Sequence, residues 1–158
     1  MTRPRWPEYF INIAEQVATR STCPRASVGA VLVKDNRILA TGYNGSPSGT
    51  VHCFNDGGEP LCILNEQGRN CKRVIHAEMN AIAHAAAHGV SINGAVMYFW
   101  DSRDRSALDC DICPLLMIAS GIKYVIGRNL LPLDLDRYFH LPNPILGPNR
   151  PTKDELNG

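Results

Sequence analysis

Two short motifs in this chain combine side chains that bind transition metals with one carboxylate. The first, His-Ala-Glu, runs from His76 to Glu78, and the second, Cys-Asp-Ile-Cys, runs from Cys110 to Cys113. One imidazole and two thiolates provide three ligands of a tetrahedral zinc site and leave the fourth position for water, as catalytic zinc requires. Glu78 lies close to such a metal without being needed as a ligand. We therefore predict a catalytic zinc held by His76, Cys110 and Cys113, with Glu78 as general acid and base.

Each motif alone is weak evidence, because H-x-E occurs by chance and C-x-x-C is also found in redox-active and buried pairs. The two together, at the starts of successive predicted helices, are typical of zinc-dependent deaminases, in which zinc hydroxide attacks the amino-bearing carbon of a base. The alternative is a closed zinc site in a binding protein without catalysis, with Glu78 merely capping its helix. That alternative requires a fourth protein ligand, and no unassigned Cys or His is adjacent in sequence.

The elements that must position these motifs follow from hydrophobic periodicity and turn residues. They are a helix over 6–20, strands over 27–33 and 37–43, a helix over 77–88 stopped by Gly89, a strand over 95–100, a helix from about 111 to 120, and a strand over 123–126. This order predicts an α/β fold, with a mixed sheet between layers of helices. Residues 44–73 are rich in Gly and Pro and contain three cysteines, so this long loop needs a staple or a role at the site.

Length and composition limit the other possibilities. The chain has 158 residues, of which 44% are hydrophobic, so we expect one domain over 1–158 with a Pro-rich tail over 130–158. Lys plus Arg number 16 against 15 Asp plus Glu, and a net charge of +1 gives no support for a nucleic-acid partner. The sequence has neither an apolar run of about 18 residues nor a secretory signal, so we expect no membrane association and a cytoplasmic location.

Several segments resemble the deoxycytidylate deaminase family, one of the cytidine deaminase-like families of zinc enzymes. The matching segments are Arg20–Arg25, Val28–Val31, Thr41–Pro47, His76–Ile82 and Gly121–Ile122. The resemblance implies hydrolytic deamination of deoxycytidylate (dCMP) to deoxyuridylate (dUMP). It also implies that Asn44 forms a hydrogen bond with the deoxyribose and that the Ala77 backbone contacts the base. It also implies a three-layer α-β-α sandwich around a five-stranded sheet, a homohexamer, and a dCTP or dTTP effector with Mg²⁺.

The same resemblance implies a second, structural zinc. Its ligands would be Cys23, Cys53, Cys62 and Cys71, with His52 as the reserve ligand if one cysteine is not used. Four thiolates form a closed site that would tie the long loop to the start of the first strand. The alternative is four free, buried cysteines, because free Cys packs as a small hydrophobe.

The chain departs from the family pattern before the second motif. Asp109 replaces the usual Pro, the usual Tyr-Val-Thr is Tyr98-Phe99-Trp100, and the loop over 101–108 is longer than expected. Asp109 could read a donor on a purine or modified pyrimidine, although capping the third helix or facing solvent is the simpler interpretation. Trp100 could stack on the base or belong to the core.

These departures leave deamination of another free nucleotide as the main alternative. A deaminase that edits RNA or single-stranded DNA is less favoured, since the basic stripe expected of it is missing.

Overall fold

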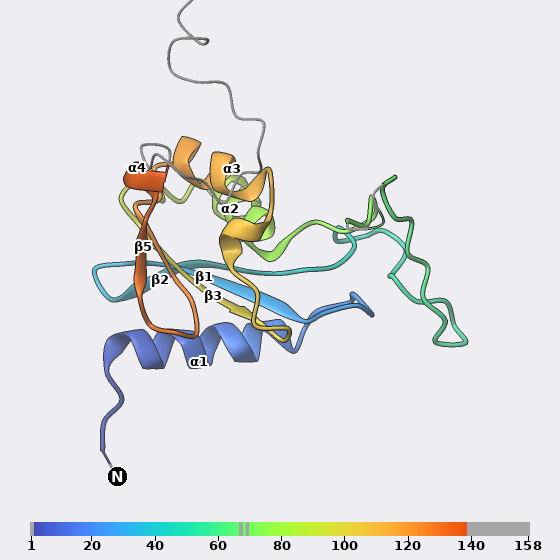
Figure 1. Ribbon diagram of the computed structural model, residues 1–158, viewed down its shortest axis with the longest axis horizontal. Coiled ribbons are helices and arrows are strands. Elements are labelled where there is room, and N and C mark those ends of the chain that lie inside the picture. The colour runs from blue at the N-terminus through green and yellow to red at the C-terminus, as the bar shows by residue number, and fades with distance from the viewer. Residues whose placement is uncertain (1, 67, 69, 139–158) are drawn as a thin grey trace, which may run out of the picture.

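The computed structural model describes residues 2–66, 68 and 70–138, and its five strands form one sheet with helices on both faces (Figure 1). The helices are α1 (Trp6–Ala18), α2 (Ala77–Ala87), the 3₁₀ turn η1 (Ala107–Asp109), α3 (Cys113–Ala119) and α4 (Leu135–Tyr138). The strands are β1 (Val28–Lys34), β2 (Arg37–Tyr43), β3 (Val96–Asp101), β4 (Tyr124–Ile126) and β5 (Pro132–Asp134). The predicted α/β sandwich with a mixed five-stranded sheet is confirmed. Most of the Pro-rich tail lies outside the described residues.

The sheet has the strand order β2-β1-β3-β4-β5. Only the β3–β4 pair is parallel, and the chain makes this crossover through α3. β1 is apolar from Val28 to Val33 and buried over those six residues, as expected of a strand with neighbours on both sides and helices on both faces. The β1–β2 turn uses Asp35 and Asn36 with φ of 50° and 59°, the left-handed conformation that two-residue hairpins favour.

The two faces of the sheet bury different residues, and β3 shows how they are divided. Met97 and Phe99 belong to the core under α2 and α3, whereas Tyr98 and Trp100 pack toward α1 with Phe10. Successive side chains of a strand point to opposite faces, so adjacent residues of β3 belong to different layers. In Figure 1, α1 lies on one side of the sheet and α2 and α3 lie on the other.

Two glycines allow the helices to approach the sheet closely. A Cβ atom at Gly42 on β2 would lie 2.3 Å from the backbone nitrogen of Ala81 and 2.4 Å from the carbonyl oxygen of Ala77. At Gly29 on β1 it would lie 2.0 Å from the carbonyl oxygen of Ala14. Both positions therefore require glycine for packing against α2 and α1, and not for an unusual backbone angle.

The ends of the elements differ in part from the sequence expectation. Gly89 has a φ of 65° and follows the C-cap of α2, which confirms the predicted stop. α3 begins at Cys113, two residues later than expected, because Cys110 has an extended backbone (φ −95°, ψ 135°) that separates η1 from α3. β5 was not predicted, since its three residues begin with proline.

The loop between β2 and α2 leaves the body of the fold as an extended arm, seen at the right of Figure 1. Isolated bridges join Gly45 to Ile75, Phe54 to Pro60 and Leu64 to Cys71. The first of these bridges closes the loop at its base, so the arm begins and ends beside the sheet.

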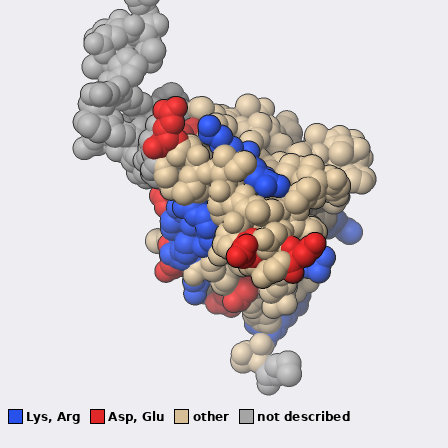
Figure 2. Space-filling view, turned by 90° about the vertical axis from the view of Figure 1, so that its right-hand side faces the viewer, with Lys and Arg blue, Asp and Glu red and all other residues tan. Residues whose placement is uncertain are grey.

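Charges of both signs are distributed over the surface. On the face seen in Figure 2, groups of Lys and Arg lie next to groups of Asp and Glu, and no continuous basic stripe crosses that face. Among the described helices, none has both the length and the apolar character needed to span a bilayer.

Candidate active site

His76, Cys110 and Cys113 come together where the starts of two helices meet. His76 is the N-cap of α2, Cys110 follows η1, and Cys113 is the first residue of α3. Their ligand atoms all lie within 4.8 Å of one another, and His76 Nδ1 is 3.2 Å from Cys113 Sγ. Among the described residues, no other group of three or more His, Cys, Asp or Glu side chains has its ligand atoms this close together. One imidazole and two thiols fit zinc, which prefers nitrogen and sulfur donors in tetrahedral geometry.

The two thiols have opposite protonation preferences. The hydrogen bond from the Cys113 thiol is the main cause that lowers the pKa of Cys110 to about 4, and the Cys113 backbone N–H also donates to Cys110 Sγ at 3.2 Å. The same hydrogen bond and burial raise the pKa of Cys113. The hydrogen bond with Cys110 also raises the pKa of His76. Cys110 is therefore the more readily ionised of the two thiols, and zinc, which binds thiolates, must displace the proton of Cys113.

Glu78 lies beside the three ligands, one residue into α2, and only 4% of it is exposed. Burial raises the pKa of its carboxyl to about 7, against the lowering effects of its own backbone N–H and of His76. Both protonation states are therefore accessible near neutral pH. That is the property a general acid and base needs.

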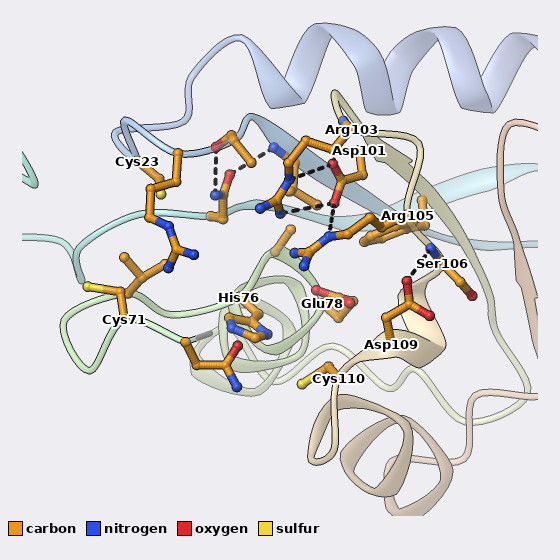
Figure 3. Close-up of a pocket in the computed structure, with 18 residues that line it drawn as sticks. Cys23, Cys71, His76, Glu78, Asp101, Arg103, Arg105, Ser106, Asp109 and Cys110 are labelled. Carbon is orange, nitrogen blue, oxygen red and sulfur yellow. Dashed lines mark hydrogen bonds and ion pairs between the residues drawn. The ribbon is translucent and has the colours of Figure 1, made fainter. Parts of the chain in front are cut away.

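These residues open onto a cleft that encloses about 680 Å³, including the space open to solvent (Figure 3). Its floor contains His76, Glu78 and Cys110, and its opposite wall is formed by the β3–α3 loop, with Asp101, Arg103 and Arg105. Small-molecule sites are typically concave clefts of this kind, with a few polar groups that converge on the ligand.

Three of the four predicted substrate residues line this cleft, namely Asn44, Ala77 and Asp109. The Asn44 side chain is buried and bound to backbone: Oδ1 accepts from the Val28 N–H at 2.8 Å, and Nδ2 donates to the Ala26 carbonyl at 2.9 Å. Asn44 therefore fixes the start of β1 as well as facing the cleft.

Asp109 accepts a hydrogen bond from the Ser106 N–H at 3.1 Å and closes the turn η1. It does not cap α3, whose N-cap is Ile112.

Trp100 is not brought to the cleft. Its ring packs with the residues under α1, and the guanidinium of Arg128 lies 5.5 Å from the ring centroid. Its neighbours Phe99 and Asp101 line the cleft instead. The reason is the alternation of side chains along β3.

The four cysteines expected at a second zinc are only partly gathered. Burial and then the charges of Cys71 and Cys23 raise the pKa of Cys62, so these three thiols lie near one another. Cys53 is buried, His52 is exposed, and all six cysteines are free thiols. Cys23 and Cys71 also line the cleft.

Asp101, Arg103 and Arg105 form a cluster at this wall of the cleft. From the sequence, Arg103 and Arg105 could contact a phosphate or belong to a solvated loop, and Asp101 had no role. Asp101 is buried, and its carboxylate pairs with both arginines. A carboxylate at the end of an apolar strand, followed by two nearby arginines, is the signal that could have identified this group.

The chain matches a known family over most of its length. Residues 4–128 match the family described as "Cytidine and deoxycytidylate deaminase zinc-binding region". ComE operon protein 2 of Bacillus subtilis is 42% identical over 125 residues, covering 79% of this chain and 60% of the relative. The deoxycytidylate deaminase of Schizosaccharomyces pombe is 38% identical over 143 residues, covering 84% of this chain and 39% of the relative. The chain thus spans less than two thirds of these two relatives. It spans 96% of the deoxycytidylate deaminase of Mycobacterium phage D29, which is 38% identical over 131 residues, or 80% of this chain.

A solved structure has the same fold. The crystal structure of dCMP deaminase from the cyanophage S-TIM5, in complex with dCMP and dUMP, superimposes with a TM-score of 0.60 and is 29% identical in sequence. The superposition covers 80% of this chain and 83% of that protein.

Proposed function

Because the chain belongs to the family of cytidine and deoxycytidylate deaminases that is defined by a zinc-binding region, we propose that it catalyses the hydrolytic deamination of deoxycytidylate to deoxyuridylate. The observation that carries this proposal is the buried Glu78 beside a group of three zinc-type ligands that opens onto a cleft. The relatives in the fission yeast and the mycobacterium phage, both named deoxycytidylate deaminase, support the choice of substrate.

Under this proposal, His76, Cys110 and Cys113 hold the zinc ion. When bound, zinc would lower the pKa of a water molecule and supply the nucleophile. Glu78 accepts a proton from the attacking water and gives it to the ring nitrogen N3 of cytosine. It then carries the second proton of that water to the departing amino group. Oxygen is bonded to C4, the C4–N bond breaks, and ammonia and deoxyuridylate leave.

The remaining cleft residues position the substrate. Asn44 Oδ1 and Nδ2 each make one hydrogen bond to the backbone and can each make another. We expect these remaining positions to bind the deoxyribose, and the Ala77 backbone to contact the base. The close packing of α2 on β2 would keep both residues in place relative to Glu78.

Turnover measured by ultraviolet absorbance tests the proposal. Purified protein should deaminate deoxycytidylate, and Glu78→Gln, which keeps the shape of the side chain but cannot carry the proton, should lose turnover while retaining zinc. Deoxyadenylate, deoxyguanylate and cytidylate serve as competing substrates. Equal behaviour of wild type and Glu78→Gln would favour a zinc-stapled binding protein.

A second candidate is deamination of another free nucleotide, a purine or a modified pyrimidine. The observation that favours it is Asp109 in the lining of the cleft, a carboxylate that can accept hydrogen bonds from ring N–H and amino groups. If Asp109 reads the base, Asp109→Asn changes the relative rates among nucleotides. If it only closes η1, the relative rates stay the same.

We also propose the second zinc, bound by Cys23, Cys53, Cys62 and Cys71. Its support is the proximity of Cys62 to Cys71 and Cys23, together with the need of the long arm for a staple. Two zinc ions per chain in the wild type and one in Cys62→Ala would agree with it. Equal zinc contents would contradict it.

The remaining expectations stay predictions. They are a single domain over 1–158, a homohexamer, a dCTP or dTTP effector with Mg²⁺, and a cytoplasmic location.

A further inference from the structure

One buried carboxylate at the end of β3 organises two arginines. Asp101 Oδ1 accepts from the Arg103 backbone N–H at 2.7 Å and from Arg103 Nε at 3.3 Å, and Oδ2 lies 3.3 Å from Arg103 Nη2. Arg105 Nε lies 3.5 Å from the same Oδ2. The side chain of Asp101 is only 2% exposed, so its charge requires a partner.

The negative charge of Asp101 needs only one of the two arginines as its partner. Arg103 alone supplies a two-nitrogen contact and a backbone donor to the carboxylate. Arg105 adds only the contact through Nε, the guanidinium nitrogen nearest its backbone. Within the described part of the chain, its two terminal nitrogens make no further ion pair or hydrogen bond. Arg105 therefore keeps unused donors, and its side chain is 52% exposed.

Both guanidinium groups face the cleft. Figure 3 shows Arg103 and Arg105 beside Asp101, on the side of the cleft that looks toward His76 and Glu78. Asp101 is the carboxylate that pairs with these two guanidinium groups. Asp109, the next carboxylate along the wall, makes no ion pair with an arginine among the described residues; it accepts from the Ser106 N–H. The terminal nitrogens of Arg105, which no carboxylate of the described residues engages, are therefore available to an anionic ligand.

We propose that Arg103 and Arg105 bind the 5′-phosphate of the substrate, and that Asp101 is the positioning residue that holds them. This inference rests on the proposed function for the identity of the nucleotide, and it assigns the preference for nucleotide over nucleoside to the β3–α3 loop. A phosphate suits the pair because planar guanidinium groups bind its oxygens in a two-point geometry. The base and the sugar are neutral and supply no countercharge.

Binding of the reaction product, with and without its phosphate, tests this assignment without turnover. Isothermal titration calorimetry would compare deoxyuridylate with deoxyuridine on the zinc-loaded wild type. It would then repeat the comparison on Arg103→Gln, Arg105→Gln and the matched control Arg128→Gln. Arg128 is an arginine of the β4–β5 loop that pairs with Asp104 and does not line the cleft.

The expected result is that Arg103→Gln and Arg105→Gln each weaken deoxyuridylate binding about 10- to 100-fold and leave deoxyuridine binding unchanged, as for loss of a charge-assisted hydrogen bond. Arg128→Gln should change neither. Asp101→Asn should lower the ratio of the two affinities, which a merely structural residue would not do.

Two results would overturn the proposal. One is equal weakening of both ligands by Arg105→Gln, which would mean that the arginine contacts the base or sugar. The other is a wild type that does not prefer the phosphorylated ligand. Failure of the proposed reaction gives a different pattern, since a protein that turns over no deoxycytidylate can still show the arginine-dependent preference for deoxyuridylate.

Discussion

Replacement of Gly42 by alanine would push α2 away from the sheet. The new Cβ atom would lie 2.3 Å from the Ala81 nitrogen, whereas an ordinary contact begins at 3.4 Å, so the helix must shift by about 1 Å. The atoms it meets belong to the backbone of α2 and cannot rotate away. Overpacking of this kind costs about 1–3 kcal/mol of unfolding free energy. For a chain of this size, that lowers the unfolding temperature by about 2–4 °C per kcal/mol.

The shift should also reach the chemistry, because α2 carries His76 at its N-cap and Glu78 in its first turn. A displacement of about 1 Å at a catalytic group costs about 100-fold in rate. We expect Gly42→Ala to lower both zinc affinity and turnover, measured at a temperature where the variant is fully folded.

Gly29→Ala is the matched variant, since its Cβ atom would clash as severely, at 2.0 Å, with α1 on the opposite face. It should lose similar stability while retaining zinc affinity and turnover when folded. Gly127→Ala, whose Cβ atom would approach Asn129 Oδ1 only to 3.8 Å, should change neither property. The reasoning is refuted if Gly42→Ala melts with the wild type, or if Gly29→Ala loses as much zinc affinity as Gly42→Ala.

Three further results are expected. Glu78→Gln should lower kcat by at least about 100-fold with zinc content unchanged by atomic absorption, and a loss of zinc would show that Glu78 supports the metal instead. Removal of metal with a chelator should abolish turnover, and Zn²⁺ but not Mg²⁺ should restore it, because one imidazole and two thiols are poor ligands for magnesium; restoration by Mg²⁺ would refute the ligand assignment. Asn44→Ala should lower the unfolding free energy by about 1–3 kcal/mol in denaturant titration, since the Val28 N–H and the Ala26 carbonyl lose their side-chain partner, and unchanged stability would mean that water replaces it.

The grouping of His76, Cys110 and Cys113 was predictable because His76 and Cys113 lie at the starts of two helices on one side of the sheet, and Cys110 precedes Cys113 by three residues. The helix and strand order was predictable for a similar local reason: β1 is an unbroken apolar run, and Gly89 ends α2. Neither inference required knowledge of distant contacts.

Other features depend on tertiary pairing and could not be predicted in this way. β5 is three residues long and begins with Pro132, so its only signal is its pairing with β4. Phe99 and Asp101 line the cleft and Trp100 packs under α1 because their side chains lie on opposite faces of β3. That choice is fixed by the pairing of β3 with β1, which places Trp100 opposite Gly29.

The alternation along β3 separates two kinds of selection at adjacent positions. Phe99 and Asp101 lie at the cleft, whereas Tyr98 and Trp100 are packed under α1. A library that varies positions 99 and 101 should therefore change which ligands are accepted, while one that varies 98 and 100 should change mainly how firmly α1 is held. Because Phe99 also belongs to the core under α2 and α3, the first library would change stability as well, whereas the second would leave the lining of the cleft unchanged.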